Sequence, residues 1–267
     1  MKKGQISNLL RRFGLMYLTD WVRFYMQAYQ NRKSNQEFKK AYPQIPLPPD
    51  YLIYESFQID YQKYYFGGQE TAKWLTDHLQ RHVDLSDKKI LDWGCGPGRI
   101  IRHLPEIMNH ICEFFGTDYN KKSIEWCTRH LPGIHFNHNS LSAQLPYQNH
   151  FFDVIYGISI FTHLSEPLHH EWFAELYRVL KPGGILFLTT QGNNFKSKLT
   201  QPELANFEAG KLVVRGQVKE GHRTFSAFQP AGFMHRLFAP AEILEHLEPL
   251  PQPGKGIPQD IWIIKKQ

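Results

Sequence analysis

From residue 89 onward the chain alternates short runs of β-forming residues with segments of helical periodicity. The runs cover residues 89–93, 112–117, 134–137, 153–158 and 185–190. Helical segments lie between them, around residues 99–109, 120–131 and 166–180. We expect the last of these to end in a turn at Lys181-Pro182-Gly183-Gly184. Strands that alternate with helices form a parallel sheet with helices on both faces, so the sequence predicts an α/β domain.

The first fifty residues differ from the rest in charge and pattern. Residues 1–40 hold nine Lys/Arg against two Asp/Glu, whereas the remaining residues hold 22 against 23, so the net charge of +6 belongs to the N-terminus. Apolar residues recur at helical spacing over residues 6–29, which predicts one or two amphipathic helices. Four prolines then make residues 42–50 an extended linker. We predict a basic helical arm and linker over 1–50 and one domain over 51–267.

Two locations are open for this arm. It can pack on the rest of the domain or over its cleft, or residues 1–40 can lie on an anionic membrane surface or bind a protein partner. No apolar run reaches the roughly 20 residues of a membrane span. Arg11 and Arg12 interrupt what would be the hydrophobic part of a secretory signal. Three cysteines without a CxxC pattern favour a reducing, cytoplasmic setting, with the arm open to peripheral contact with a membrane.

A glycine-rich segment follows the first β-forming run and carries the strongest functional signal. Gly94, Gly96 and Gly98 permit positive φ and let a ligand approach the backbone closely. Open α/β sheets bind nucleotide-like ligands at this point. The dinucleotide pattern would require a third glycine where Arg99 stands. Asp92 before the loop would repel a pyrophosphate but suits an ammonium group, so the loop favours a cofactor with an amino-acid part.

Asp118 follows the second β-forming run, 20 residues after Gly98. A carboxylate at that place can accept hydrogen bonds from both ribose hydroxyls of a nucleoside. The alternative is a helix N-cap, because a helical segment begins near residue 120. The distance from the glycine loop favours the ribose ligand.

These residues resemble the class I S-adenosylmethionine (SAM)-dependent methyltransferases over about residues 60–190. The resemblance implies a Rossmann-like, seven-stranded, mostly parallel sheet whose last strand is antiparallel, with residues 261–265 as that strand. It also implies SAM as cofactor. The cofactor-binding residues that it suggests are Asp92, Gly94, Cys95, Gly96, Pro97, Gly98, Asp118, Tyr119, Asn139, Ser140 and Tyr64.

Within that set the expected roles differ. The loop would hold the methionine part of SAM, with Cys95 as a small packing residue in it. Asp118 would hold the ribose and Tyr119 would lie against adenine. Asn139 stands where many members have an Asp beside the adenine amino group, and its amide oxygen can accept in the same way. Tyr64, like its neighbours Tyr61 and Tyr65, either lines a pocket or packs in the core.

Candidate catalytic bases are histidines. His163 follows the fourth β-forming run, and the alternative role for it is a backbone hydrogen bond in a helix-entry turn. His222 and His235 lie in residues 205–240, a long connection that we expect to cover the cleft; each can also be a surface residue. His169 and His170 begin a helix and are expected to face solvent. Spaced His/Cys ligands are absent, so we expect no metal.

The sequence constrains the methyl acceptor mainly by excluding one class of substrate. Tyr156-Gly157-Ile158-Ser159 stands where enzymes that methylate amino groups of nucleic acid bases carry an Asp/Asn-Pro-Pro-Tyr/Phe motif. The neutral body also disfavours a nucleic acid base as acceptor. The whole chain, with its tail at residues 256–262, resembles bacterial methyltransferases of the small-molecule type. This resemblance implies methyl transfer by in-line displacement to an O or N nucleophile of a small molecule, such as a glycan or a secondary metabolite. The alternatives are a protein or rRNA methyltransferase that binds through the basic arm, and a non-catalytic SAM-binding module. In the tail we expect a strand at 212–214, a short helix near 240–247 and the strand at 261–265.

Overall fold

The computed structural model describes residues 3–109, 112–254 and 256–267, with side chains described from residue 8 onward. Residues 1–2, where the predicted basic arm begins, lie outside the described residues. The chain divides into two compact units. We call Tyr17–Ser140 the loop unit, and Met1–Met16 with Leu141–Gln267 the C-terminal unit. The predicted division at residue 50 stays a prediction.

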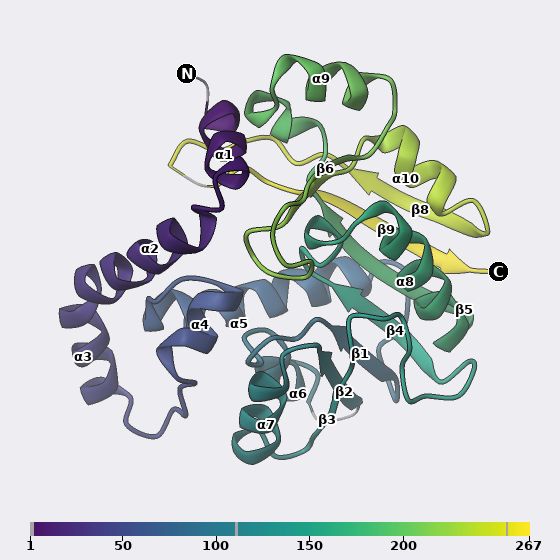
Figure 1. The fold of residues 1–267 in the computed structure, drawn as a ribbon. Coiled ribbons are helices and arrows are strands. Elements are labelled where there is room, and N and C mark those ends of the chain that lie inside the picture. Colours follow the sequence, from purple (N-terminus) through teal and green to yellow (C-terminus); the bar gives the residue numbers. More distant parts are fainter. Residues whose placement is uncertain (1–2, 110–111, 255) are drawn as a thin grey trace. The chain divides into compact units, whose positions relative to one another are not determined.

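The strands form a seven-stranded sheet in the order β3-β2-β1-β4-β5-β9-β8. In the loop unit β1 (Lys89–Trp93), β2 (Glu113–Asp118) and β3 (Ile134–His138) pair in parallel. In the C-terminal unit β4 (Phe152–Gly157) and β5 (Leu180–Thr190) pair in parallel, and β9 (Asp260–Lys266) is antiparallel to β5. The predicted Rossmann-like sheet with an antiparallel last strand is confirmed (Figure 1).

The predicted helix near 240–247 is wrong. Residues Ala241–Leu247 form strand β8, which pairs antiparallel with β9. Its sequence, AEILEHL, is rich in helix-forming residues, but pairing along the apolar strand β9 outweighs that preference. The sheet therefore ends in an antiparallel hairpin and not in a strand followed by a helix.

The expected turn at 181–184 is also part of a strand. Helix α8 (Glu166–Val179) ends as predicted, but β5 begins at once with Leu180 opposite Phe152. The pairing resumes with Ile185 opposite Val154, so residues 181–184 form a bulge. The Lys181 Nζ lies 2.8 Å from Asp153 Oδ2 at this bulge.

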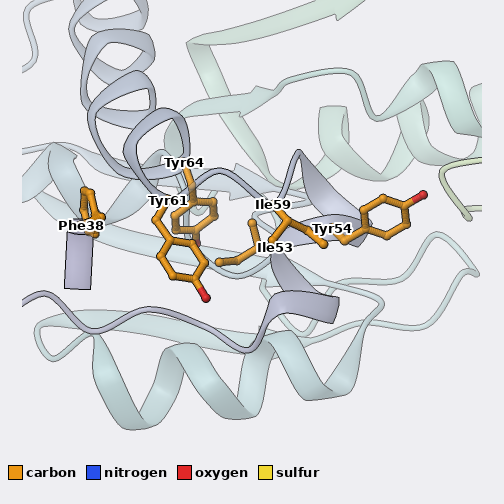
Figure 2. Close-up of a cluster of buried hydrophobic side chains, with 6 residues drawn as sticks. All are labelled: Phe38, Ile53, Tyr54, Ile59, Tyr61 and Tyr64. Atoms are coloured by element: carbon orange, nitrogen blue, oxygen red, sulfur yellow. The ribbon is translucent and has the colours of Figure 1, made fainter. Parts of the chain in front are cut away.

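In the loop unit the helices surround an aromatic core. They are α2 (Met16–Gln30), α3 (Arg32–Ala41), α4 (Asp50–Ser56), α5 (Tyr61–Leu79), the 3-10 turn η1 (Ile101–His103), α6 (Leu104–Ile107) and α7 (Lys121–His130). Buried side chains from α3 to α5 meet in one cluster, which Figure 2 shows: Phe38, Ile53, Tyr54, Ile59, Tyr61 and Tyr64. Phe24 and Ala28 of α2 pack against this cluster, as do Ile45 and Leu47 of the proline-rich linker.

Helix α5 begins at Tyr61, ahead of two adjacent glycines. The Asp60 side chain caps it by accepting a hydrogen bond from the Lys63 backbone N–H. Gly67 and Gly68 therefore lie inside the helix. At Gly68 the helix passes so close to the following segment that a Cβ would lie 2.3 Å from the Arg99 carbonyl oxygen. The glycine is required by this close approach.

The C-terminal unit places shorter elements around its strands. Its helices are α1 (Lys3–Arg12), α8, α9 (Gln201–Glu208) and α10 (Ala231–Leu237), with the 3-10 turns η2 (Phe161–His163) and η3 (Asn193–Lys198). Strands β6 (Val213–Arg215) and β7 (Ser226–Phe228) form a separate hairpin, so the strand predicted at 212–214 is present one residue later.

Arg11 of α1 is buried, although it was counted among the basic residues of the arm. Its guanidinium donates hydrogen bonds to the carbonyl oxygens of Arg215 at 3.0 Å, Gly216 at 3.1 Å and Thr224. Asn8 donates to Glu203 in the same region. Arg11 therefore fixes α1 to the β6–β7 hairpin and is not a surface charge.

Candidate functional site

The glycine-rich loop connects β1 to η1 and lies entirely within the loop unit. All three of its glycines have left-handed φ angles: 78° at Gly94, 52° at Gly96 and 78° at Gly98. The backbone N–H groups of Gly94 and Cys95 both donate to the Thr117 carbonyl oxygen on β2, at 2.8 and 3.0 Å. The loop is thus a compact turn held against the end of the neighbouring strand.

Close packing is a second reason why two of these positions require glycine. A Cβ on Gly96 would lie 3.1 Å from the Ser56 Cβ, and one on Gly98 would lie 2.5 Å from the Leu131 Cδ1. The loop is therefore enclosed by the end of α4 and by the residue that follows α7. A side chain at either position would displace the backbone on which a ligand would rest.

Asp118 ends β2 and turns its buried carboxylate toward the loop. Its Oδ2 accepts a hydrogen bond from the Gly96 N–H at 2.8 Å, and its Oδ1 accepts from the Asn120 N–H at 2.7 Å. Burial raises the pKa of Asp118 to about 6, against the opposing effect of these two backbone bonds. The N-cap of α7 is Asn120, whose side chain accepts from Lys122 and Ser123, so Asp118 is not the cap.

The predicted adenine-side residues lie at the ends of β2 and β3. The Asn139 side-chain oxygen accepts from the Thr117 hydroxyl at 2.6 Å, and its amide nitrogen donates to the Ser140 carbonyl at 2.7 Å. These bonds fix the amide orientation in a buried position. Tyr119 is half-buried, and its carbonyl bonds to the His138 ring at 3.1 Å. Ser140 is exposed.

Tyr64 and Cys95 support the loop from below its surface. The Tyr64 side chain is fully buried, and its hydroxyl donates to the Pro97 carbonyl at 2.7 Å. The Cys95 thiol is buried against Gly116, and burial raises its pKa well above the usual range. Asp92 is buried on β1. The loop residues are thus brought together with Asp118, whereas Tyr64 reaches the loop through a backbone oxygen; direct contact of Tyr64 with a cofactor stays a prediction.

His163 belongs to the C-terminal unit, at the end of η2. Its Nδ1 donates to the Phe225 carbonyl at 2.9 Å, and its own carbonyl accepts from the Gly221 N–H at 3.0 Å. Since a carbonyl can only accept, Nδ1 carries the proton and the lone pair is on Nε2. Burial lowers the pKa of His163, so the ring is neutral at neutral pH. The backbone hydrogen bond considered as the alternative role is present.

Segment 220–225, part of the predicted covering connection, is held against this turn. Besides the two bonds at His163, the Glu220 carboxylate accepts from the Ser165 N–H. His222 is half-buried, and its Nδ1 pairs with the Thr224 hydroxyl at 2.8 Å and accepts from the Thr224 N–H at 3.3 Å. His222 therefore stabilises its own turn. Whether residues 205–240 cover a cleft stays a prediction.

Of the two histidines that were predicted to face solvent, one is exposed and the other is buried. His170 is exposed as expected, but His169 is fully buried, so that prediction is wrong for it. His169 donates from Nδ1 to the Ser165 carbonyl at 2.7 Å and lies 3.1 Å from the Gln229 amide nitrogen. Its ring stacks on Phe161. His235 packs edge-on against Trp262.

A polar cluster that the sequence pattern did not predict lies at the carboxyl ends of β4 and β5. The Ser159 N–H donates to the Thr189 hydroxyl at 2.9 Å, and Gln259 bonds to both side chains, at 2.7 and 2.6 Å. Ser159 has a left-handed φ of 66°. In open α/β sheets this edge is where ligands bind. Ser159, two residues beyond β4, could have been singled out by position, but Gln259 is 70 residues from Thr189 along the chain.

Comparison with known proteins agrees with this geometry. A family model described as "Methyltransferase domain" matches residues 90–184. The phthiotriol/phenolphthiotriol dimycocerosates methyltransferase 1 of Mycobacterium ulcerans is 31% identical over 151 residues, which are 53% of this chain and 54% of that protein. The tRNA (carboxymethyluridine(34)-5-O)-methyltransferase of Arabidopsis thaliana is 30% identical over 151 residues, 56% of this chain and 34% of that protein. The chain thus spans about half, or less, of these relatives' lengths.

Solved structures show the same fold. The crystal structure of a SAM-dependent methyltransferase from Methanosarcina mazei superposes with a TM-score of 0.54 at 21% identity, over 71% of this chain and 96% of that one. Residues 90–184 are thus similar in sequence to a methyltransferase domain, and the fold is that of the class I SAM-dependent methyltransferases.

Proposed function

We propose that this protein transfers a methyl group from SAM to an oxygen or nitrogen nucleophile of a small molecule. The observation that carries the proposal is the hydrogen bond between the glycine-rich loop and the buried carboxylate of Asp118. Three left-handed glycines at alternate positions, Gly94, Gly96 and Gly98, form the turn at the end of β1, and Asp118 bonds to the middle one. This arrangement suits a ligand with an amino-acid part and a ribose.

The residues present fit SAM on two observations. A Cβ at Gly98 would overlap the Leu131 side chain, and one at Gly96 would press against Ser56, so both positions favour glycine. Each Asp118 oxygen accepts one backbone N–H, and a carboxylate oxygen has a second lone pair for a ribose hydroxyl. Asp92, Tyr119 and Asn139 are the further residues proposed to hold the ammonium and the adenine.

SAM supplies an already activated methyl group as a sulfonium. The protein's part is to hold the nucleophile in line, and positioning of this kind contributes on the order of 7–11 kcal/mol. A hydroxyl nucleophile also needs a base. His163, neutral and with its lone pair on Nε2, is the proposed base, with His222 as the second candidate.

The acceptor class is proposed from charge. Beyond residue 40 the Lys/Arg and Asp/Glu numbers nearly balance, which disfavours a nucleic acid backbone as a partner. The relatives named above act, by their names, on a dimycocerosate and on a tRNA, so both classes need a test. A glycan or a secondary metabolite stays the finer proposal, and the protein or rRNA alternative remains.

The experiment has two steps. Calorimetry with SAM on the full chain tests the cofactor, and a lack of binding at millimolar SAM would contradict the whole proposal. Incubation with methyl-labelled SAM and lysate fractions, with and without nuclease, then identifies the acceptor class. Label in a small-molecule fraction that survives nuclease supports the proposal. Nuclease-sensitive label favours rRNA, and SAM binding with no labelled product favours a non-catalytic module.

We further propose that α2 places the protein on an anionic membrane surface. One face of α2 packs on the aromatic cluster through Phe24 and Ala28, and the Tyr54 hydroxyl bonds to Asp20 at 2.7 Å. The other face leaves seven apolar side chains exposed: Tyr17, Leu18, Trp21, Val22, Tyr25, Met26 and Tyr29. Aromatic residues of this kind suit the interface between headgroups and acyl chains.

The basic residues near this face favour anionic lipid. Arg23, Arg32, Lys33, Lys39 and Lys40 are all exposed in the loop unit. Helical basic segments with an apolar face bind anionic lipid.

In the part of the chain that the structure describes, no helix has the length and apolarity needed to span a bilayer. A cytoplasmic location stays a prediction. Binding to anionic vesicles tests the surface.

A further inference from the structure

One imidazole and two carboxylates converge where β8 ends and β9 begins. His246 lies on β8, Glu248 follows that strand, and Asp260 is the first residue of β9. One ligand atom from each lies within 4.8 Å of the other two. The His246 Nε2 is 3.1 Å from the Asp260 Oδ2. No sequence pattern predicts this group, because it forms only through the pairing of β8, a segment whose local preference is helical, with β9.

Asp260 is the member of this group that most needs a partner. Its side chain is 1% exposed, and its Oδ1 is buried without a hydrogen-bond partner among the described residues. A buried ionised oxygen without a partner is costly, and buried charges in proteins are paired or bind metal ions. The Glu248 carboxylate of the same group adds like charge nearby. A bound cation would relieve both effects.

The surroundings hold each of the three side chains in place. A Cβ on Gly192 would lie 2.0 Å from the Asp260 Oδ2, so only glycine leaves room for the carboxylate. The His246 ring stacks on Trp262, with ring centroids 3.6 Å apart and planes 8° apart. The Asn193 amide donates to both Glu248 oxygens at 2.9 and 3.0 Å. Metal ligands are typically oriented by such contacts.

We propose that His246, Glu248 and Asp260 bind one zinc ion. A neutral imidazole and two carboxylates sum to −2, which a divalent ion neutralises. Zinc accepts nitrogen and carboxylate oxygen at about 2.0–2.2 Å, and two ligands of one such ion lie slightly more than 3 Å apart, near the His246–Asp260 separation. Imidazole favours zinc over magnesium or calcium, which prefer oxygen ligands alone.

The place of the site suggests a contact with a ligand as well as a structural role. Asp260 pairs with Thr190, the last residue of β5, so the group lies at the carboxyl end of a parallel strand. Open α/β sheets bind ligands at that edge. Three protein ligands leave a coordination position for water or a ligand oxygen. The proposal does not depend on methyl transfer.

The test uses the full chain after treatment with a chelator. Calorimetry with ZnCl₂ is expected to give one zinc per chain, and thermal unfolding is expected to shift upward with zinc and not with MgCl₂. His246→Ala and Asp260→Asn should abolish the stoichiometric binding. Asn193→Ala should weaken it by about 10–100-fold, the range for residues that orient a ligand. Glu242→Gln, an exposed acid on the same strand, is the matched control and should bind as the native chain does.

Glu248→Gln separates loss of the site from loss of the fold. Glu248 is exposed, so this variant should unfold without metal at the native temperature and yet bind zinc more weakly. The chain has 14 histidines, so adventitious zinc binding must be distinguished. If His246→Ala or Glu248→Gln still binds one zinc with native affinity, or the native chain binds none, the site does not exist.

Discussion

At the scale of single residues, Asp118 carries two opposing influences. Burial disfavours its charged form and raises its pKa to about 6, while the Gly96 and Asn120 N–H groups favour the charge. The folded pKa lies above the unfolded value of 3.8. The group therefore contributes stability that is complete below pH 3.8 and is lost as the pH rises through about 6. A bound ribose would add hydrogen bonds to the carboxylate and favour ionisation.

The first prediction follows from that linkage. SAM affinity should fall as the pH is lowered through about 6, because the free protein then holds a proton on Asp118 that ribose binding must release. Asp118→Asn should flatten this part of the profile, and Asp118→Ala should weaken binding at pH 7.5 by about 1.5–3 kcal/mol. Calorimetry from pH 5 to 8 measures both. Native pH dependence in the Asn variant would place the ribose elsewhere.

The second prediction separates two roles of His163. As a base it needs its Nε2 lone pair; as a support it needs only the Nδ1–H that bonds to the Phe225 carbonyl. Asparagine offers an N–H donor near that place but no base. If His163 is the base, both His163→Ala and His163→Asn should lower kcat, by about 10²–10⁴-fold, and leave SAM affinity unchanged. Recovery of kcat in the Asn variant would reduce His163 to a support. The melting temperature of each variant serves as the folding control.

The contact between the glycine loop and Asp118 was more readily predicted than the other contacts because its signals are local. Gly94, Gly96 and Gly98 stand within five residues, and Asp118 follows the next strand at a fixed distance. His246 and Asp260 are brought together by strand pairing across 14 residues, and Arg11 meets Thr224 across 213. Such contacts depend on tertiary structure, and neither charge nor periodicity of a single segment encodes them.

At the scale of elements, each error of the sequence analysis has a packing cause. The strand pattern of β1 and β9 was found almost to the residue, since both are dense in β-branched and aromatic residues. Strand β8 was missed because its local preference is helical and its partner β9 decides its state. Helix α5 continues through Gly67 and Gly68, and the close approach of the Arg99 carbonyl requires the glycine at position 68.

Those two glycines give the third prediction. Gly68→Ala would place a Cβ 2.3 Å from the Arg99 carbonyl, and such overpacking typically costs about 1–3 kcal/mol of unfolding free energy. Gly67→Ala, in the same helix, meets no atom within 4 Å and should stabilise by about 0.5–1 kcal/mol through helix preference. Urea unfolding of both variants measures the contrast. Equal effects would mean that α5 does not approach the loop as described.

The fourth prediction concerns the attachment of α1. Arg11→Ala removes donors to three backbone carbonyls, two of which are buried interactions, so α1 should separate from the β6–β7 hairpin. Hydrogen exchange of residues 3–12 should then become faster, and thermal stability should fall. Arg12→Ala is the matched control, because Arg12 is exposed. An unchanged exchange rate in the Arg11 variant would show that other contacts hold the helix.

At the scale of the whole molecule, the charge and the apolar surface coincide along the sequence. The chain carries +6 overall, and residues 1–40 account for all of it. The same stretch contains α2 with its exposed apolar face, on which Trp21 and Tyr29 are 59% and 81% exposed. Contiguous apolar surface of this kind marks an interaction site. Because basic residues accompany it, an anionic bilayer satisfies both features at once.

The last prediction tests that surface directly. The full chain should sediment with vesicles that contain anionic lipid and much less with zwitterionic vesicles, and added salt should weaken the binding, since each Lys/Arg near the surface contributes about 1 kcal/mol. Replacing Trp21, Tyr25 and Tyr29 by serine should abolish binding while SAM affinity stays native. Leu250→Ser, an equally exposed apolar residue outside α2, is the matched control. Lipid binding through α2 requires these three side chains to enter the membrane interface, so normal vesicle binding by the triple variant would contradict the proposal. If the native chain is a dimer and the triple variant is a monomer, the apolar face of α2 binds a second copy of the chain and not lipid.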